Sequence, residues 1–388
     1  MTEKTDIFVR GVQDAMDNIL RFWTENMQDP RGGYYGRMSS SGEIDESAPK
    51  GVVLNTRILW AMSAAYRAGR KEEHLLAATR AKDYMVENFF DHKHGGVYWT
   101  LDTDNNRLDA RKQAYAQAFA IYALCEYIRA TGDESPLNYA KNLYTVLEKE
   151  LRDRENGGYV EALERDWSEC KGCDCSSVKR IGTQIHVLEA LSALYEIWPD
   201  PQVRESLVSL LEVFVEKIYN PETGHLNNKF DKEWKPLCNC CSFGHEMEAS
   251  WILLHAAFCV GDICLVNRVR KVSDAAYRAG SCGIHLDGSL VKGVSGEGKY
   301  DCDRYWWAQA EAVVACLYVW KYRGCPEAAR KALRCWDYIS SNFVSPKGEW
   351  YRRLSADGKP YPEDDLVSAD KGPYHNTRMC AEILSILK

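Results

Sequence analysis

Gly95-Gly96-Val97-Tyr98-Trp99 is the fullest copy of a short glycine–aromatic turn that recurs along the chain. The other copies are Gly32-Gly33-Tyr34-Tyr35, Gly157-Gly158-Tyr159, Gly224-His225-Leu226, Asp287-Gly288-Ser289-Leu290 and Gly348-Glu349-Trp350. Successive turns lie 60 to 67 residues apart. Self-similarity at a fixed long period indicates that one supersecondary unit has been copied. Because six copies fill the chain and neither end shows an atypical capping unit, we predict a closed ring of units rather than an open stack.

Helical stretches occupy the sequence between these turns. Residues 55–66, 113–127 and 185–198 carry apolar side chains at helical spacing, whereas residues 71–88 and 202–219 are more polar and amphipathic. Each unit therefore contains one helix for an inner layer and one for an outer layer. We predict an all-α fold, an (α/α)6 barrel of twelve helices with short hairpins and loops at one end. No Pro/Ser-rich linker divides the sequence, so we expect a single domain over residues 1–388.

The amino-acid composition argues against some classes of binding partner. Apolar residues make up 45% of the chain, and the formal net charge is −7 with no long basic run. This balance argues against nucleic acid as a partner. No stretch approaches the roughly 20 apolar residues of a membrane helix, and the first residues lack the apolar core of a secretory signal. We therefore expect a cytoplasmic protein with no membrane partner, either a monomer or a homodimer.

Fifteen cysteines are unusual in a chain that shows no export signal. Six of them are bunched as Cys170-x-x-Cys173-x-Cys175 and Cys238-x-Cys240-Cys241. Thiolates two or three residues apart can converge on one zinc ion, and two such clusters could complete a four-coordinate structural site. The alternative is a pair of reduced loops, or loops with adventitious disulfides. Of the cysteines that stand singly, we expect Cys125, Cys259, Cys316 and Cys380, all on apolar helices, to pack as small hydrophobic side chains.

Three histidines and one arginine stand near the starts of apolar helices. These residues are Arg57, His186, His245 and His375. A single histidine on such a helix is more often a core residue than a catalyst. Because closure of the ring would point matching positions of different units into one cavity, we predict that this set forms the active site.

Five segments, residues 49–60, 112–119, 244–251, 306–312 and 373–379, carry a resemblance to a known family. Over nearly its whole length the chain resembles the N-acylglucosamine 2-epimerase superfamily, and within it the cellobiose 2-epimerases. The resemblance implies an (α/α)6 barrel that needs no metal or redox cofactor for its chemistry. It further implies a sugar substrate and epimerisation at C2 of the reducing-end unit, which converts glucose to mannose.

That reaction explains why these residue types are needed. The C2 proton of an open-chain aldose lies next to a carbonyl, so its removal gives an enediolate. Inversion requires a proton on the opposite face, which favours two groups, one base and one acid, with pKa values near neutrality. The resemblance places this pair on His245 and His375. Arg57, a permanent cation, would stabilise the developing oxyanion, unless it only forms an ion pair with a neighbouring carboxylate.

The resemblance also extends to substrate contacts. It makes His186 a substrate contact or a helper in ring opening. We expect Glu248 to orient an imidazole, hold a sugar hydroxyl or close an ion pair, and Trp307 to stack on a pyranose ring or to belong to the core. The predicted substrate-binding residues are Tyr115, Glu248, Trp307, Glu311 and Asn55.

Three positions depart from the cellobiose 2-epimerase pattern. Gly182 and Gln184 stand where that family has Asn and His, and Asp370 replaces a tryptophan that stacks on sugar. We therefore expect an altered disaccharide subsite beside an intact proton-transfer pair. Two alternatives stay open: an aldose–ketose isomerase of the mannose/fructose type, and a non-catalytic carbohydrate-binding barrel. A glycoside hydrolase, which would need two suitably spaced carboxylates, is a further use of such a barrel.

Overall fold

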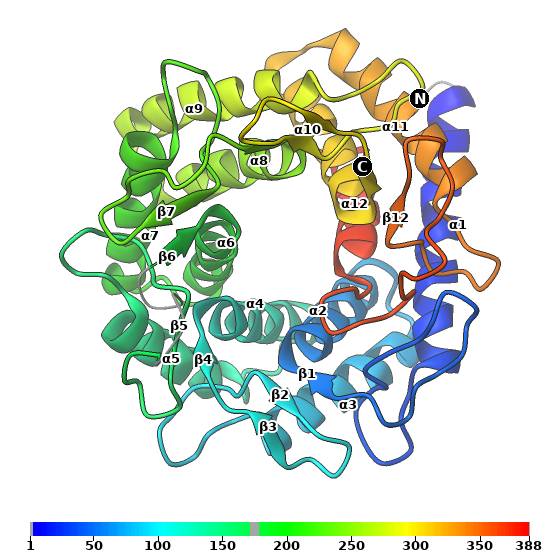
Figure 1. The fold of residues 1–388 in the computed structure, drawn as a ribbon. Helices are drawn as coiled ribbons and strands as arrows, with labels where there is room; N and C mark the ends of the chain where they lie inside the picture. Colours follow the sequence, from blue (N-terminus) through cyan, green and yellow to red (C-terminus); the bar gives the residue numbers. More distant parts are fainter. Residues whose placement is uncertain (1–2, 171–177, 388) are drawn as a thin grey trace.

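Six helices form the inner ring of the computed structural model, which describes residues 3–170 and 178–387 (Figure 1). These inner helices are α2 (Val52–Gly69), α4 (Ala114–Thr131), α6 (Ile181–Ile197), α8 (Phe243–Val260), α10 (Trp306–Arg323) and α12 (Tyr374–Leu387). Each packs against the next, and the ring closes where α12 packs against α2. The predicted closed ring is therefore confirmed.

Six further helices surround this ring. The outer helices are α1 (Glu3–Asn26), α3 (Glu72–Asn88), α5 (Leu137–Val146), α7 (Pro201–Val213), α9 (Ile263–Ser281) and α11 (Pro326–Asn342). Helices α5 and α7 each continue into one π-helical turn, Leu147–Leu151 and Phe214–Ile218. Because α1 packs against α12, the first and last helices of the described chain complete the outer layer together. The twelve-helix (α/α)6 barrel is confirmed.

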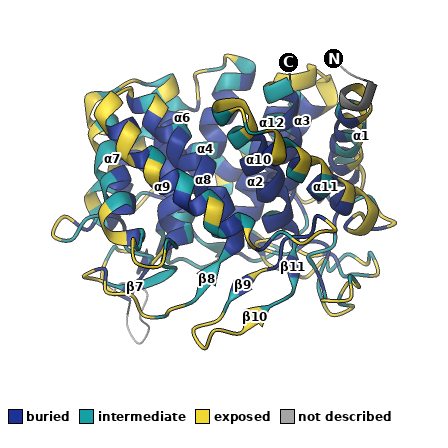
Figure 2. Ribbon diagram, turned by 90° about the horizontal axis from the view of Figure 1, so that it is seen from above, coloured by how far each residue is buried: buried dark blue, intermediate teal, exposed yellow. Residues whose placement is uncertain are grey.

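Burial separates the two layers. The inner helices are buried on nearly every side, whereas the outer helices bury only the face that meets the inner ring (Figure 2). Alanine at Ala114, Ala116, Ala118, Ala120 and Ala123 of α4 is buried in this way, and such small side chains allow neighbouring helices to approach closely. Among the described residues, no helix combines the length and apolarity that a membrane crossing needs.

The glycine turns and the short strands lie at the end of the barrel where the inner helices begin (Figure 2). The strands are β1 (Lys50–Gly51), β2 (Thr100–Leu101), β3 (Arg107–Asp109), β4 (Lys112–Gln113), β5 (Ala162–Leu163), β6 (Val178–Arg180), β7 (Lys229–Asp231), β8 (Cys241–Ser242), β9 (Gly293–Val294), β10 (Tyr300–Asp301), β11 (Arg304–Tyr305) and β12 (Arg353–Leu354). They pair antiparallel in two three-stranded and three two-stranded sheets, in the orders β1-β2-β3, β10-β9-β8, β11-β12, β4-β5 and β6-β7.

Each glycine turn closes on a single antiparallel bridge, and the six bridges are equivalent. The bridged pairs are Gln28 with Tyr34, Phe90 with Val97, Arg152 with Tyr159, Tyr219 with Leu226, Ile284 with Leu290 and Val344 with Trp350. Gly96 shows why the turn requires glycine. Its φ of +72° is unfavourable for other residues, and a Cβ there would lie 2.8 Å from the side chain of Gln117.

Three of the turns are bound by a buried lysine. Each lysine lies in the strand that precedes an inner helix and donates hydrogen bonds to its turn. Lys112 donates to Asp91 at 3.1 Å and to the carbonyl of Gly95 at 2.8 Å. The same arrangement joins Lys179 to Asp153 and the carbonyl of Gly157, each at 2.8 Å. Equivalent contacts run from Lys50 to Asp29 and to the carbonyl of Gly32. Because both members of each pair are buried and hydrogen-bonded, the position of each turn relative to its helix is fixed.

A buried polar side chain at the fourth position of the inner helices holds the same turns from within. The amide of Gln117 accepts from the N–H of Val97 and donates to its carbonyl, at 2.8 and 3.0 Å. Gln184 makes the same pair of bonds to Tyr159, and Gln309 to Leu290. In α8 the fourth residue is Glu246, which accepts from His225 at 2.7 Å. These contacts belong to the repeated frame, and they join the starts of α4, α6, α8 and α10 to the neighbouring turns.

Candidate active site

The predicted catalytic side chains meet at the end of the ring that carries the loops. Arg57, His186, His245 and His375 lie in the first two turns of α2, α6, α8 and α12. The ring centroids of His186 and His375 are 6.4 Å apart. The indole of Trp307 lies 4.9 Å from the imidazole of His245 and 5.9 Å from that of His375. Ring closure thus brings together three histidines that are widely separated in sequence.

The residues next to His245 in the sequence, Ser242 and Gly244, determine how its imidazole and the indole of Trp307 lie at the start of α8. Ser242 caps α8, and its hydroxyl accepts from the N–H of His245 at 3.3 Å. Gly244 gives the indole of Trp307 room to lie against α8, because a Cβ on Gly244 would come within 2.6 Å of that ring. His245 and Trp307 are half-buried on otherwise buried helices, and both line a cavity of about 400 Å³. The half-buried Tyr115 contacts His186, with ring centroids 4.8 Å apart.

A layer of buried charge lies one turn deeper in the barrel, centred on Arg378 of α12. Its guanidinium donates to Glu248 at 3.0 Å and to Glu311 at 2.6 Å, and it also pairs with Glu189 and contacts the hydroxyl of Tyr374. Arg378 and the three carboxylates are at most 5% exposed. One arginine thus links α6, α8, α10 and α12 beneath the imidazoles.

The carboxylates of this layer hold two of the three histidines. Nδ1 of His375 contacts Glu311 at 2.8 Å, and Nδ1 of His186 contacts Glu189 at 2.7 Å. An ionised carboxylate only accepts hydrogen bonds, so each neutral imidazole carries its proton on Nδ1. Nε2 is then the nitrogen through which His186 or His375 can exchange a proton with a ligand. Nδ1 of His245 is buried and has no hydrogen-bond partner among the described residues.

Burial and neighbouring charges shift the pKa values of the three carboxyl groups in different directions. Burial opposes ionisation of Glu311, but Arg378 and His375 lower the pKa of Glu311 to about 2. Arg378 likewise lowers the pKa of Glu189 against the effect of burial. Burial and the nearby Glu311 charge raise the pKa of Glu248 well above its usual value. The pKa of Glu248 is therefore shifted in the direction opposite to those of Glu189 and Glu311.

The imidazoles are neutral in the resting site. Burial lowers the pKa of His245 to about 4, with a small further effect from His186. Burial also lowers the pKa of His375 well below its usual value and outweighs the opposing effect of Glu311. The pKa of His186 shifts in the same direction for the same reason. At neutral pH each ring thus offers an unprotonated nitrogen, as a general base requires.

Arg57 presents a cation beside these rings. One of its terminal nitrogens donates to the hydroxyl of Tyr115 at 2.8 Å, and the other donates to the backbone carbonyl of Asp370. The guanidinium also lies over the ring of Phe119, 4.9 Å from its centroid. Among the described residues no carboxylate forms an ion pair with Arg57, and its Nε has no hydrogen-bond partner, so its charge is available to an anionic group beside these rings.

The other predicted contacts occupy different environments. Glu311 is fully buried and accepts from Trp251 at 3.0 Å as well as from His375 and Arg378. Glu248 contacts Arg378 rather than His245, and its carboxyl lies 4.0 Å from Nδ1 of His375. Asn55 is fully buried, and its amide donates to the carbonyl of Gly51 at the start of α2.

The three departures from the family pattern have distinct structural roles. Gln184 holds the turn at Tyr159 and belongs to the frame. Gly182 lies beside His245: a Cβ at that position would be in ordinary contact with Nε2 of the imidazole, at 3.4 Å. Asp370 forms a two-pronged ion pair with Arg352, at 2.6 and 3.0 Å, and its own backbone carbonyl holds Arg57. The position of the missing tryptophan is therefore occupied by a charged pair.

Two sets of possible metal ligands can be compared with the sequence predictions. Glu248, Glu311 and His375 have ligand atoms within 4.8 Å of one another, but the guanidinium of Arg378 already supplies the positive charge between the carboxylates. Of the cysteine clusters, Cys173 and Cys175 lie outside the described residues. Cys238 and Cys240 are joined in a disulfide, while Cys170 is buried and Cys241 is half-buried. The structural zinc site stays a prediction.

Sequence reasoning missed the central arginine. Arg378 follows His375 by three residues, so both lie on one face of α12. Its partners Glu189 and Tyr374 were missed as well. Glu189 follows His186 at the same spacing as Arg378 follows His375, and this parallel spacing was the available signal.

Comparisons with known proteins identify the family of this chain. The model of the N-acylglucosamine 2-epimerase family matches residues 33–379. A cellobiose 2-epimerase of Bacteroides fragilis is 40% identical over 381 residues, which cover 96% of this chain and 97% of that protein. The solved cellobiose 2-epimerase of Bacillus thermoamylovorans matches with a TM-score of 0.92 and 33% identity, over 98% of this chain and 99% of that one. A solved D-mannose isomerase has the same fold, with a TM-score of 0.83 at 21% identity over 96% of this chain and 97% of that one.

Proposed function

The chain belongs to the N-acylglucosamine 2-epimerase family, a family of carbohydrate epimerases, and we propose that it inverts C2 of a reducing-end aldose. The substrate is a glucose or mannose unit, as in cellobiose or a related β-1,4 disaccharide. The proposal draws this substrate class from the cellobiose 2-epimerases that resemble it along almost their whole length. We take the reaction to proceed through a cis-enediolate.

The observation that carries the proposal is that two imidazoles from different inner helices both lie close to the indole of Trp307. His245 and His375 both contact this indole, and they come from different inner helices. A sugar carbon held against Trp307 can therefore be approached by both rings. Inversion at a carbon needs this arrangement, since the proton leaves from one face and returns to the other.

The different surroundings of His245 and His375 suit them to different roles in the proposed reaction, one as base and the other as acid. His245 has no carboxylate partner and stays unprotonated, so it is the base that takes the C2 proton of the open-chain sugar. His375 is neutral at rest, so its Nε2 must first take a proton from solvent, and Glu311 at Nδ1 stabilises the imidazolium that forms. This imidazolium then delivers its Nε2 proton to the opposite face, and His245 afterwards releases the C2 proton to solvent. In the reverse direction the two roles exchange.

Arg57 and His186 complete the proposed reaction. When C2 loses its proton, negative charge develops on the carbonyl oxygen at C1, and the unpaired guanidinium of Arg57 can stabilise it. Tyr115 keeps that guanidinium in place. His186, whose Nδ1 is bound to Glu189, can use Nε2 to move the ring-opening proton. Glu311 and Glu248 act through His375 and Arg378 as positioning residues.

Proton exchange into the sugar tests the proposal directly. Incubation of cellobiose, lactose, glucose and mannose in D2O, followed by NMR, should show deuterium at C2 together with the C2 epimer of the substrate. His245→Asn and His375→Asn should each abolish the exchange, whereas His92→Asn, which alters an exposed histidine, should retain it. A ketose without the epimer would instead establish an aldose–ketose isomerase, and ligand binding without exchange would establish a binding protein. Released monosaccharide would indicate a hydrolase.

A further inference from the structure

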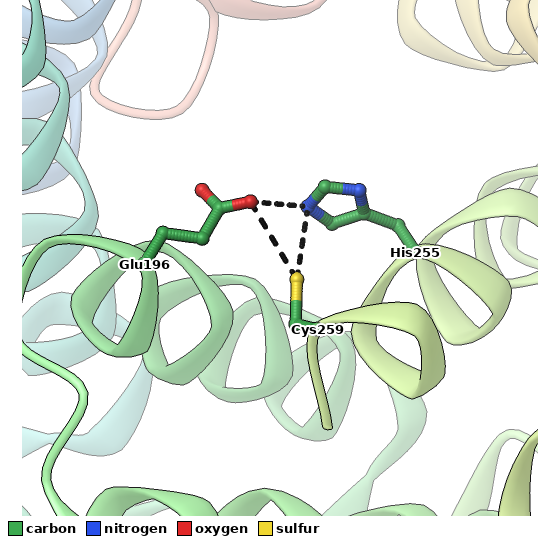
Figure 3. Close-up of side chains that lie close together, drawn as sticks. All are labelled: Glu196, His255 and Cys259. Carbon is green, nitrogen blue, oxygen red and sulfur yellow. Dashed lines mark hydrogen bonds and ion pairs between the residues drawn. The ribbon is translucent and has the colours of Figure 1, made fainter. Parts of the chain in front are cut away.

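Cys259 departs from the behaviour predicted for single cysteines on apolar helices. Cys125, Cys316 and Cys380 are buried as small hydrophobic side chains, as expected. Cys259 is half-buried instead, in the last turn of α8, and its thiol contacts two polar side chains. Those partners are His255 of the same helix and Glu196 of α6 (Figure 3). The cluster lies where the inner helices end, far from the loops.

The three ligand atoms form a nearly equilateral triangle. Nε2 of His255 lies 3.4 Å from the carboxylate of Glu196 and 3.7 Å from Sγ of Cys259. The sulfur lies 3.5 Å from the same carboxylate oxygen. Figure 3 shows these atoms pointing toward one another rather than toward the helices that carry them.

This triangle has the dimensions of a tetrahedral zinc site. Zinc binds imidazole nitrogen and carboxylate oxygen at about 2.0–2.2 Å and thiolate sulfur at about 2.3 Å. Around a tetrahedral ion with those bond lengths, neighbouring ligand atoms stand about 3.3–3.6 Å apart. A zinc ion could therefore enter with only small movements of the three side chains.

We propose that Glu196, His255 and Cys259 bind one zinc ion, or a divalent cation of similar softness, at the end of the barrel opposite the loops. Three protein ligands leave a fourth position open for water or a small ligand. Glu196 and His255 line a cavity of about 240 Å³ at this end, so the open position can face it. The His255–Cys259 spacing of four residues puts both ligands on one face of α8.

The surroundings orient the ligands and leave an entry path. Arg129 binds the second oxygen of Glu196, which leaves the first oxygen directed at His255 and Cys259. The charge of Arg129 is itself offset by Glu126, at 2.9 Å. The side chains of Glu196 and His255 are 34% and 42% exposed, so an ion can reach them from solvent.

The site is separate from the proposed epimerase centre. Cys259 follows His245 by fourteen residues on α8, which is about 21 Å along a helix axis. An ion at this end of the barrel is too far away to contact a sugar held between His245 and His375. Metal binding can therefore be tested without reference to turnover.

The test is cobalt and zinc binding by the full chain after treatment with a chelator. One equivalent of Co²⁺ should give the thiolate-to-cobalt charge-transfer band and the intense visible bands of a four-coordinate ion, and one equivalent of Zn²⁺ should abolish both. Cys259→Ser should remove the charge-transfer band and lower bound zinc by one ion per chain. Glu196→Gln should keep the band but weaken binding.

Matched controls separate this site from the predicted cysteine-cluster site. Cys282→Ser, which changes an exposed cysteine at the end of α9, and Cys173→Ser should both retain the signal that depends on Cys259. The proposal is overturned if Cys259→Ser binds as much zinc as the unaltered chain. It is also overturned if no thiolate band develops before cobalt is in large excess over protein.

Discussion

The two ends of the inner ring shift the pKa of a histidine in opposite directions. His245 in the first turn of α8 is half-buried, has no carboxylate partner among the described residues and has a pKa lowered by burial to about 4. His255 lies near the end of the same helix. There burial also opposes the charge, but the contacts with Cys259 and Glu196 outweigh it and raise the pKa of His255. The surroundings thus lower the pKa of one histidine and raise the pKa of the other, which suits His245 to the proposed role of base.

The two ends also differ in how their arginines are held. At the loop end Arg378 is fully buried and serves three carboxylates from three helices. At the opposite end Arg129 is 30% exposed and bridges Glu126 and Glu196 near solvent. The charges at the loop end are buried and held by several partners, as the proposed reaction centre requires, whereas those at the opposite end are partly exposed to solvent.

Removal of the acid should produce the largest effect on the loop end. General acid–base groups contribute about 10²- to 10⁴-fold to rate, so we expect His375→Asn to lower kcat by that factor. The Asn side chain can still donate to Glu311, which should preserve the fold. Initial rates of epimer formation, with circular dichroism as the check on folding, measure this. A loss below tenfold would remove His375 from the proton-transfer pair.

Removal of the central arginine should give the largest loss of stability. Arg378→Met leaves three buried carboxyl groups without their common partner, and breaking a buried ion pair costs about 3–5 kcal/mol. Arg129→Met at the opposite end should cost about 1 kcal/mol or less, because that pair is partly exposed. Urea denaturation of both variants gives the two free energies of unfolding. Equal losses would contradict the contrast between the ends.

Much of the barrel fold could be predicted because its structural unit recurs in the sequence. The glycine turns and the alternation of apolar and amphipathic helices are local patterns, so their period was visible in one sequence. The three histidines of the loop end could be found because each interrupts an apolar helix. The resemblance to the epimerases then supplied their roles.

The remainder depends on contacts that only ring closure creates. Glu189 and Arg378 are far apart in sequence, and each alone looks like an ordinary charged residue on a helix. The His255–Cys259 spacing was visible, but nothing in the sequence indicated that Glu196 of another helix would meet them. Gln184 shows a different limit. Comparison with the family pattern suggested a lost site residue, whereas the equivalent Gln117 and Gln309 show that it holds the frame.

Loss of this frame contact should affect stability rather than chemistry. In Gln184→Leu the N–H and carbonyl of Tyr159 lose their buried partner, and an unsatisfied buried group costs about 1–3 kcal/mol. Gln117→Leu, the matched change in the neighbouring unit, should cost a similar amount. Both variants should keep kcat within a few-fold when assayed well below their melting temperatures. If Gln184→Leu lost activity without losing stability, Gln184 would instead belong to the active site.

The smallest expected change in activity is the pH dependence of kcat/KM. It tests whether the pKa of His245 at the loop end is lowered, in contrast to that of His255 at the opposite end. His245 must be unprotonated to take the C2 proton, and its pKa of about 4 keeps it so throughout the neutral range. As the pH falls through this value the base becomes protonated, so kcat/KM should decline tenfold per unit below about pH 4. An imidazole with an ordinary pKa would instead place this decline near about pH 6.5. The measurement is kcat/KM against pH, with tryptophan fluorescence at each pH to show that the protein stays folded. A decline centred near the ordinary value would mean that the loop end does not desolvate His245, and the contrast with His255 would then no longer explain which end performs catalysis.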